Sequence, residues 1–249
     1  MADVDAATVR NDARQWHGLL VTGAWCAFAS VVMIVLQIGL YAVSPPPQAT
    51  PDSFDLLLEN PAFGLFTLDL PFIVSNTLAY LVYLALAVVL WRVSRSAVVI
   101  ALAFGVVDTA AYMASPRPVE MLTLAHAYAD ADAATRTALL ATGDGMLATW
   151  TRTAFDVYYF FLFATLLILA ILMLRSSIFT RATAVWGLAS AVLMAVPSNF
   201  GPVGLAFALV SLVPWSVFAV LVGRRLLHLA RLAEPVAAAA VRDNASGVA

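Results

Sequence analysis

Long apolar runs separated by short polar turns are the dominant pattern of this chain. The first run, Leu19 to Tyr41, contains no charged residue and exceeds the ~20 residues that an α-helix needs to cross a bilayer. It is also longer than the roughly 7–15 apolar residues of a cleavable signal peptide, so we expect an uncleaved membrane helix. Further helices are predicted over approximately residues 66–91, 97–113, 150–175, 182–196 and 203–222. The pattern therefore predicts an all-α fold, a polytopic transmembrane bundle of six helices.

Two longer polar segments carry signals for short helices. Ser44 to Pro61 opens with three prolines and then places apolar residues at helical spacing after Ser53, an N-cap candidate. This predicts one or two helical turns lying on the membrane interface. In Ser115 to Gly145, Pro118 suits a first helical position and Asp132 suits an N-cap, which predicts two short amphipathic helices with a break near Asp130. Both outer loops are thus expected to contain short amphipathic helices.

The arginines are distributed unevenly between the two ends of the predicted helices. Three lie at the end with the long loops, namely Arg117, Arg136 and Arg152, and ten lie at the other: Arg10, Arg14, Arg92, Arg95, Arg175, Arg181, Arg224, Arg225, Arg231 and Arg242. Cytoplasmic ends of membrane helices are enriched in basic residues, so both termini are predicted cytoplasmic in the inner (plasma) membrane. We expect a cytoplasmic N-terminal segment (residues 1–18), a six-helix membrane domain (19–232) and a flexible cytoplasmic tail (233–249).

Composition supports a membrane protein and excludes several classes of chemistry. Hydrophobic residues make up 63% of the chain and charged residues 11%. All basic residues are arginine, so no lysine can form a Schiff base as in a retinal photoreceptor. Cys26 is the single cysteine, and the three histidines, His17, His126 and His228, lie on different predicted segments. We therefore expect no metal and no cofactor, and no basic patch indicates nucleic-acid binding.

Three stretches resemble a known family of membrane proteins. They are FGLFTLDLPFIVSNTLAYLVYLALAVVLWRVSRS, LRSSIFTRATAVWGLASAVL and GPVGLAFALVSLVPWSVFAVLVGRRLLHL. The resemblance spans most of residues 15–230 and is to an uncharacterised bacterial family of multi-pass proteins with six to seven helices, catalogued as a domain of unknown function. It implies a helical fold in a membrane, and it provides no activity or catalytic residues to transfer.

Polar residues inside the predicted helices are candidates for function, because burying them in hydrocarbon is costly. At ~1.5 Å per residue from the flanking arginines, Asp108 lies roughly 20 Å and Asn76 roughly 24 Å into the membrane. They can be hydrogen-bonded partners on adjacent antiparallel helices. Three interpretations stay open for Asp108: polar packing between helices, a ligand or proton site, and snorkelling towards water.

Arg152 and Asp156 lie one turn apart at the outer end of the fourth helix. Arginine preceding aspartate is the weaker order for such a pair, and a cation near a helix N-terminus opposes the helix dipole. A carboxylate on another helix, Asp69 or Asp108, would explain Arg152, and solvation by lipid headgroups is the alternative.

Tyrosines recur at helical spacing beside these polar residues. Tyr80 and Tyr83 follow Asn76, and Tyr112 follows Asp108 by one turn. Such tyrosines also serve as packing or interface residues. If the three helix faces point inward, they line an acidic and aromatic cavity open to the outside. The candidate residues are Asp69, Asn76, Tyr80, Asp108, Tyr112, Arg152, Asp156 and Tyr159.

Two functional classes follow from these residues. The first is a binding, transport or accessory membrane protein whose partners are the lipid bilayer, a lipid or apolar small-molecule ligand, and a second copy or another membrane protein. The second is a membrane-embedded enzyme in which Asp69, Asp108 or Asp156 acts as general acid or base on an apolar substrate, by analogy with terpene cyclases or lipid-modifying enzymes.

Overall fold

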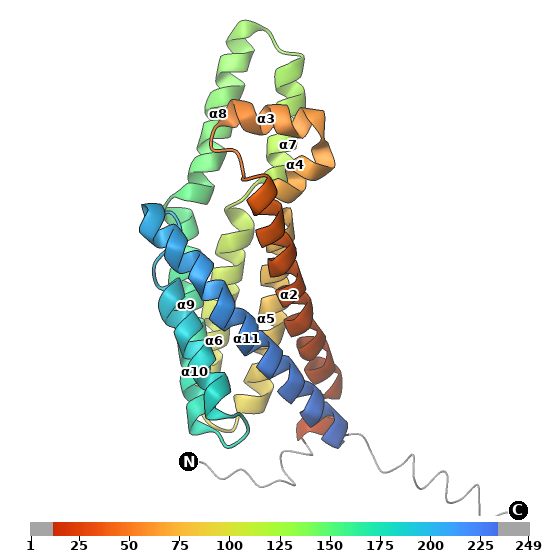
Figure 1. Ribbon diagram of the computed structural model, residues 1–249, viewed down its shortest axis with the longest axis vertical. Coiled ribbons are helices and arrows are strands. Elements are labelled where there is room, and N and C mark those ends of the chain that lie inside the picture. The colour runs from red at the N-terminus through yellow and green to blue at the C-terminus, as the bar shows by residue number, and fades with distance from the viewer. Residues whose placement is uncertain (1–11, 234–249) are drawn as a thin grey trace, which may run out of the picture.

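The computed structural model describes residues 12–233, and within them every long element is a helix (Figure 1). The predicted all-α polytopic fold is confirmed. Five helical stretches are long and apolar enough to cross a membrane. They are α2 (His17–Val43), α5 (Leu70–Leu90), α6 with α7 (Arg95–Ala114 and Pro118–Ala129), α8 with α9 (Ala133–Thr151 and Thr153–Arg175), and α11 (Gly201–Ala233). The remaining predicted span is α10 (Arg181–Met194), whose 14 residues fall short of the ~20 needed for a full crossing.

Small residues bring the membrane helices close together. Helix α2 packs against α5 and α11, α6 packs against α9, and α10 packs against both α9 and α11. At the α2–α5 contact, a Cβ built on Gly23 would lie 2.4 Å from the Cβ of Ala85. At the α2–α11 contact, a Cβ built on Gly223 would lie 3.0 Å from the Phe28 ring and 3.1 Å from the Ala24 carbonyl oxygen. Close backbone approach of this kind maximises van der Waals contact where no hydrophobic effect drives helices together.

The two long loops fold into a separate helical layer at one end of the bundle, which we call the cap. It consists of α3 (Thr50–Glu59), α4 (Pro61–Thr67), α7 and α8, and α3 lies across α7 and α8 in Figure 1. It has its own apolar core, formed by Phe54, Leu57, Leu68, Met121 and Ala125. The predicted helices of the second loop are confirmed: α7 begins at Pro118, and Asp132 accepts a 2.8 Å hydrogen bond from the Thr135 backbone N–H at the start of α8.

The predicted N-cap of the helix in the first loop, Ser53, was wrong. Helix α3 begins at Thr50 with Pro51 in its first turn, so Ser53 lies inside the helix rather than at its N-cap. Its hydroxyl donates to the Ala49 carbonyl 2.9 Å away. A proline in the first turn is compatible with the helix because that N–H has no partner there. The apolar face of α3 is covered by α7 and α8.

Two spans predicted as continuous are interrupted at the junction between cap and bundle. Between α4 and α5, Asp69 adopts the left-handed conformation with φ of 75°. Pro71 explains this break, because it lacks an N–H and its ring clashes with the carbonyl four residues earlier in a continuing helix. Between α8 and α9, Arg152 is extended (φ −131°, ψ −162°). Trp150 therefore belongs to the cap helix α8 rather than to the membrane helix.

The opposite end of the bundle carries most of the arginines and is called the arginine-rich end. It contains the start of α2, the α5–α6 and α9–α10 turns and the end of α11 (Figure 1). Arg92 forms a two-pronged ion pair with Asp12, and Arg225 Nε donates to the Ile178 carbonyl at 2.7 Å. The predicted arginines Arg10 and Arg242, and most of the two predicted terminal segments, lie outside the described residues.

Substitution of Gly143 is expected to open the cap. A Cβ at Gly143 would lie 2.3 Å from the Thr50 Cγ2 atom of α3, whereas Gly145 has no atom within 4 Å of its Cβ position. Gly143→Leu should therefore destabilise the α3–α8 contact by about 1–3 kcal/mol and speed tryptic cleavage after Arg136, while Gly145→Leu should leave the rate unchanged. Equal cleavage rates for the two variants would contradict the packing described for the cap.

Candidate functional site

Asp69 is the centre of a buried hydrogen-bond cluster at the junction of cap and bundle. Its Oδ1 atom accepts from Gln37 Nε2 at 2.8 Å and from the Tyr41 hydroxyl at 2.6 Å. Its Oδ2 atom accepts from the Tyr112 hydroxyl. All three partners are donors, which suits a carboxylate, an acceptor-only group. We call Gln37, Tyr41, Asp69 and Tyr112 the junction cluster.

The local folds of three helices explain why these side chains meet. Gln37 and Tyr41 lie one turn apart on α2 and so project from the same face. Tyr112 projects from α6, and the left-handed turn before α5 supplies Asp69. Asp69 is only 6% exposed. The cluster thus ties the first helix and α6 to the point where the cap chain enters the bundle.

Asp108 lies one turn from Tyr112 along α6 and belongs to a second buried cluster. It is 2% exposed, and its Oδ1 atom accepts from the Thr109 hydroxyl at 3.0 Å. Its Oδ2 atom and the hydroxyl of Tyr83 are both buried without a hydrogen-bond partner. Tyr83 and Tyr158 lie close enough to Asp108 for their hydroxyl groups to interact with the charge of its carboxyl group. We call Tyr83, Asp108 and Tyr158 the core cluster.

Aromatic side chains connect the two clusters and surround them. The Tyr112 and Tyr158 rings pack edge to face with centroids 4.7 Å apart, and Tyr158 packs on Tyr159 at 5.0 Å. Phe155 contacts all three tyrosines, and Tyr83 packs on Trp215 of α11 at 6.2 Å. One group of packed rings therefore includes Tyr112, the partner of Asp69, and a second group includes Tyr83 of the core cluster.

The structure brings some of the predicted residues together and separates others. Asp69, Asp108, Tyr112 and Tyr159 lie in or against the two clusters. Asn76 does not bond to Asp108, because its Nδ2 atom donates to the Phe72 carbonyl of its own helix at 2.9 Å.

Tyr80 lies beside the core cluster. Its ring packs against Gly105 of α6, where an added Cβ would be 3.2 Å from Tyr80. The Tyr80 hydroxyl is also close enough to Asp108 to interact with the charge of its carboxyl group.

Arg152 and Asp156 take no part in these clusters. The Arg152 side chain is exposed, and within residues 12–233 the ion pair found at 4.0 Å or less joins Arg92 to Asp12 instead. Asp156 accepts from Asn199 Nδ2 at 2.7 Å, and the same amide donates to the Thr151 carbonyl. The expected carboxylate partner for Arg152 is thus absent among the described residues, and Asp156 joins the α10–α11 turn to the start of α9.

Several cluster residues were not predicted from the sequence, because the prediction relied on charged residues inside apolar helices and these residues are neutral. Gln37 is the clearest, since it stands alone as an amide in the apolar run of α2, with Tyr41 one turn later. Tyr158 was hidden in the aromatic sequence VYYFF, in which the periodicity does not distinguish it from its neighbour Tyr159. A search for every buried hydrogen-bonding side chain, charged or not, would have found both.

Among residues 12–233, no three or more His, Cys, Asp or Glu side chains lie together in a way that could hold a metal ion. Asp69 accepts hydrogen bonds from glutamine and tyrosine side chains, and Asp108 accepts one from a threonine hydroxyl. Both clusters therefore place hydrogen-bonding side chains next to aromatic rings.

The fold and these clusters define a helical bundle with five stretches long and apolar enough to cross a membrane, and with buried acidic and aromatic side chains between its helices. The chain belongs to the family described as "Domain of unknown function (DUF4386)", whose model matches residues 60–229. This confirms the resemblance to an uncharacterised membrane-protein family. The match covers Asp69, Tyr83, Asp108 and Tyr158, whereas Gln37 and Tyr41 of α2 precede it. A search of curated proteins and a search of solved structures found no match.

Proposed function

We propose that this protein binds a small, largely apolar molecule carrying a hydrogen-bond donor at the core cluster, as a binding, transport or accessory component of the membrane. The observation that carries the proposal is the pair of buried, unpartnered atoms, Asp108 Oδ2 and the Tyr83 hydroxyl. A buried polar group without a partner costs about 1–3 kcal/mol, so two such groups near each other are stabilised by a molecule that bonds to both.

The surroundings of the core cluster favour a donor, and a cation in particular. Asp108 offers a carboxylate oxygen, and Tyr83 and Tyr158, which lie near it, belong to aromatic pairs with Trp215 and Tyr112. A cation near aromatic faces is attracted by about 0.5–2 kcal/mol, and a carboxylate adds a charge-assisted hydrogen bond. The Arg152 side chain is exposed and forms no ion pair with Asp69 or Asp108. Among the described residues, no arginine forms an ion pair with Asp108. An amine or alcohol on an apolar body fits these features best.

The proposed orientation places the cap outside and the arginine-rich end in the cytoplasm of a bacterial inner membrane. Eight described arginines gather at one end of the bundle, and Arg117, Arg136 and Arg152 belong to the cap or its junction. This asymmetry supports cytoplasmic termini by the positive-inside rule. Asp69, Tyr112 and Asp108 then lie towards the outer side of the membrane, whereas Tyr83 lies deeper, past the middle of α5.

Three probes with the same tail and different headgroups test the proposal. Octylamine, octanol and octanoate would be added to the purified protein while its thermal unfolding is followed. We expect octylamine to raise the melting temperature most, octanol less and octanoate not at all, because the core cluster supplies acceptors and a negative charge. Asp108→Asn and Tyr83→Phe should each reduce the response to octylamine by about tenfold in apparent affinity, the equivalent of one charge-assisted hydrogen bond.

Asp156→Asn is the matched control for this experiment. Asp156 lies on the cap side of the bundle but bonds to Asn199 outside both clusters, so its substitution should leave the response to octylamine unchanged. If the three probes act equally, or if Asp156→Asn weakens the response as much as Asp108→Asn, the core cluster is not the binding site.

An enzyme using Asp108 is the second candidate, favoured by the free Oδ2 atom near the hydroxyl of Tyr83. A carboxyl group beside a tyrosine hydroxyl, with aromatic walls that exclude water, is suited to moving a proton to or from an apolar substrate. The binding protein and the enzyme are distinguished by incubating the purified protein with membrane extract and identifying the small molecules present afterwards. Binding returns the molecule unchanged, whereas catalysis returns a product whose formation is lost in Asp108→Asn.

A further inference from the structure

One face of helix α6 carries residues of both the core cluster and the junction with the cap. Asp108, Tyr112 and Ser115 follow one another at helical spacing, so their side chains project from the same side of the helix. All three are at most 2% exposed. Asp108 belongs to the core cluster, Tyr112 bonds to Asp69, and Ser115 ends the helix. The proposed binding group and the groups that meet the cap therefore lie along a single helix face.

The cap holds this end of α6 at two points. At the first, the Tyr112 hydroxyl donates to Asp69, and the Tyr112 ring packs on Phe72 with centroids 5.7 Å apart. Asp69 and Phe72 belong to one turn, because the Phe72 backbone N–H donates to the Asp69 carbonyl at 3.0 Å. At the second, the Thr149 hydroxyl of α8 lies 3.0 Å from the Ser115 carbonyl oxygen. A movement of the cap against the bundle must therefore displace the end of α6 or break these contacts.

The Tyr112 ring extends from this junction into the core cluster. It packs edge to face on Tyr158 with centroids 4.7 Å apart, and both rings contact Phe155. Tyr158 in turn lies close enough to Asp108 for its hydroxyl to interact with the charge of the carboxyl group. Closely packed interiors transmit displacements because they are hardly compressible. A shift of Tyr112 is therefore expected to move the side chains around Asp108.

We propose that the Asp69–Tyr112 hydrogen bond positions the core cluster for binding, so that the attachment of the cap controls the affinity of the site for its ligand. This inference rests on the function proposed above. Asp69 and Tyr112 act as positioning residues, because the unpartnered atoms that would bind the molecule belong to Asp108 and Tyr83. Coupling between two sites is reciprocal, so a ligand at the core cluster also stabilises the turn at Asp69 by the same factor.

The affinity of the purified, full-length protein for octylamine tests the first half of this proposal. Tyr112→Phe keeps the ring but removes the hydroxyl that bonds to Asp69. We expect it to weaken octylamine binding about fivefold, at the lower end of the usual range for coupling between sites. Tyr41→Phe is the matched control, because it removes another hydrogen bond to Asp69 but leaves the Tyr112 bond in place, so the affinity should stay unchanged. Equal losses in both variants, or no loss in Tyr112→Phe, would overturn the proposal.

Hydrogen exchange at the turn tests the reciprocal half, and a purely structural role of the bond would not reproduce it. The backbone N–H groups of Phe72 and Ile73 donate to the Asp69 carbonyl at 3.0 and 3.2 Å, so their exchange reports opening of this turn. Saturating octylamine should slow the exchange of both groups about fivefold in the wild type and leave it unchanged in Tyr112→Phe. The same slowing in Tyr112→Phe as in the wild type would contradict coupling through the hydroxyl.

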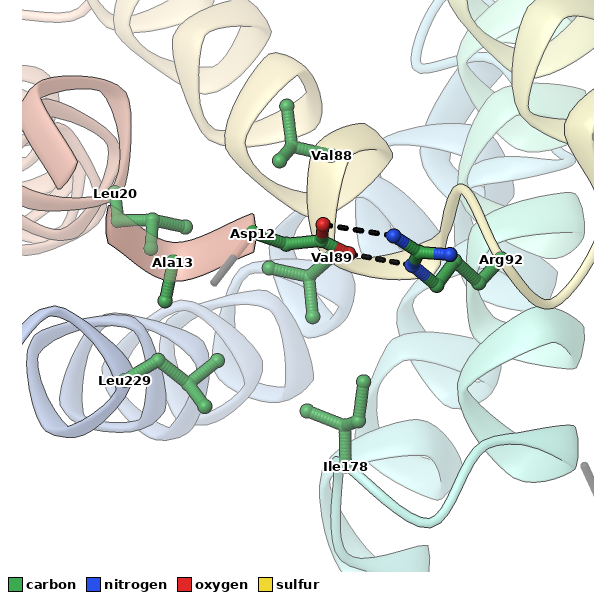
Figure 2. Close-up of a pocket in the computed structure, with 8 residues that line it drawn as sticks. All are labelled: Asp12, Ala13, Leu20, Val88, Val89, Arg92, Ile178 and Leu229. Carbon is green, nitrogen blue, oxygen red and sulfur yellow. Dashed lines mark hydrogen bonds and ion pairs between the residues drawn. The ribbon is translucent and has the colours of Figure 1, made fainter. Parts of the chain in front are cut away.

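The arginine-rich end supplies a control at the opposite end of the bundle. Figure 2 shows the Asp12 carboxylate paired there with the Arg92 guanidinium. Asp12→Asn weakens this pair and should change neither the octylamine affinity nor the exchange at the turn. A change as large as that in Tyr112→Phe would show that a general loss of stability causes the effect, and would overturn the proposal.

The wild-type response separates this proposal from the function on which it rests. Wild-type protein that does not distinguish octylamine from octanoate would refute the proposed binding function, and the coupling with it. A wild type that prefers octylamine, together with a Tyr112→Phe variant of the same affinity and the same exchange behaviour, would refute the coupling alone.

Discussion

Replacing Asp69 with glycine is expected to lower the free energy of unfolding by about 2–4 kcal/mol, because Gln37, Tyr41 and Tyr112 each lose their acceptor. Glycine adopts the observed φ of 75° without strain, so the substitution removes the carboxyl group while preserving the turn before α5. The measurement is thermal or denaturant unfolding of the purified protein, followed by far-ultraviolet circular dichroism.

Asp69→Asn is the matched control for this prediction. Asparagine also tolerates the left-handed conformation, and its oxygen can accept from Gln37 and Tyr41 while its amide donates to the Tyr112 hydroxyl. It should therefore cost much less than Asp69→Gly. Tyr112→Phe should have a smaller effect in the Asp69→Gly background than in the wild type, since its partner is already gone. Full additivity of Asp69→Gly and Tyr112→Phe would contradict the hydrogen bond between them.

Replacing Gly23 with leucine is expected to disrupt the packing of α2 on α5. A Cβ at position 23 would lie 2.4 Å from the Cβ of Ala85, far closer than two carbon atoms can approach, so one helix must move. Overpacking of a buried contact costs about 3 kcal/mol at the upper end of the usual range. We expect a lower melting temperature and a loss of the single monodisperse peak in size-exclusion chromatography.

Gly39→Leu is the control for Gly23→Leu, because it introduces the same side chain on the same helix where no atom lies within 4 Å of the Cβ position. It should behave like the wild type. A second test uses smaller steps. Gly23→Ala should be destabilising, and adding Ala85→Gly should recover part of the loss by returning space at the contact. If Gly23→Leu and Gly39→Leu are equally stable, the α2–α5 contact is not as close as described.

The fold was largely predictable from the pattern of apolar residues. Long runs without charge specify membrane helices, and the signals at Pro118 and Asp132 placed the second pair of cap helices correctly. The breaks at Asp69 and Arg152 were missed because hydropathy averages over many residues and does not respond to one backbone angle. For Asp69 a local cue was present in Pro71, whose effect on the preceding turn outweighed the apolar residues around it.

The candidate site was predictable only in part. Asp69, Asp108 and Tyr112 were found because charge inside an apolar helix is rare, and an aromatic residue one turn away shares its face. The pairing was not predictable, because helical spacing gives the face of each residue but not which faces meet. Asn76 lies at nearly the same predicted depth as Asp108, yet its amide bonds to its own helix, and Asp69 bonds to Gln37 and Tyr41 of the first helix.

We propose above all that Asp108 and Tyr83 hold a molecule between the membrane helices. Native mass spectrometry of protein extracted from its own membranes tests this most directly, with Asp108→Asn and Tyr83→Phe extracted in parallel. The account predicts that the wild type carries one bound small molecule, apolar with an amine or hydroxyl group, and that both variants have lost it. Wild-type protein free of any such molecule, or variants that retain it at the same occupancy, would contradict the account and leave both clusters as packing between helices.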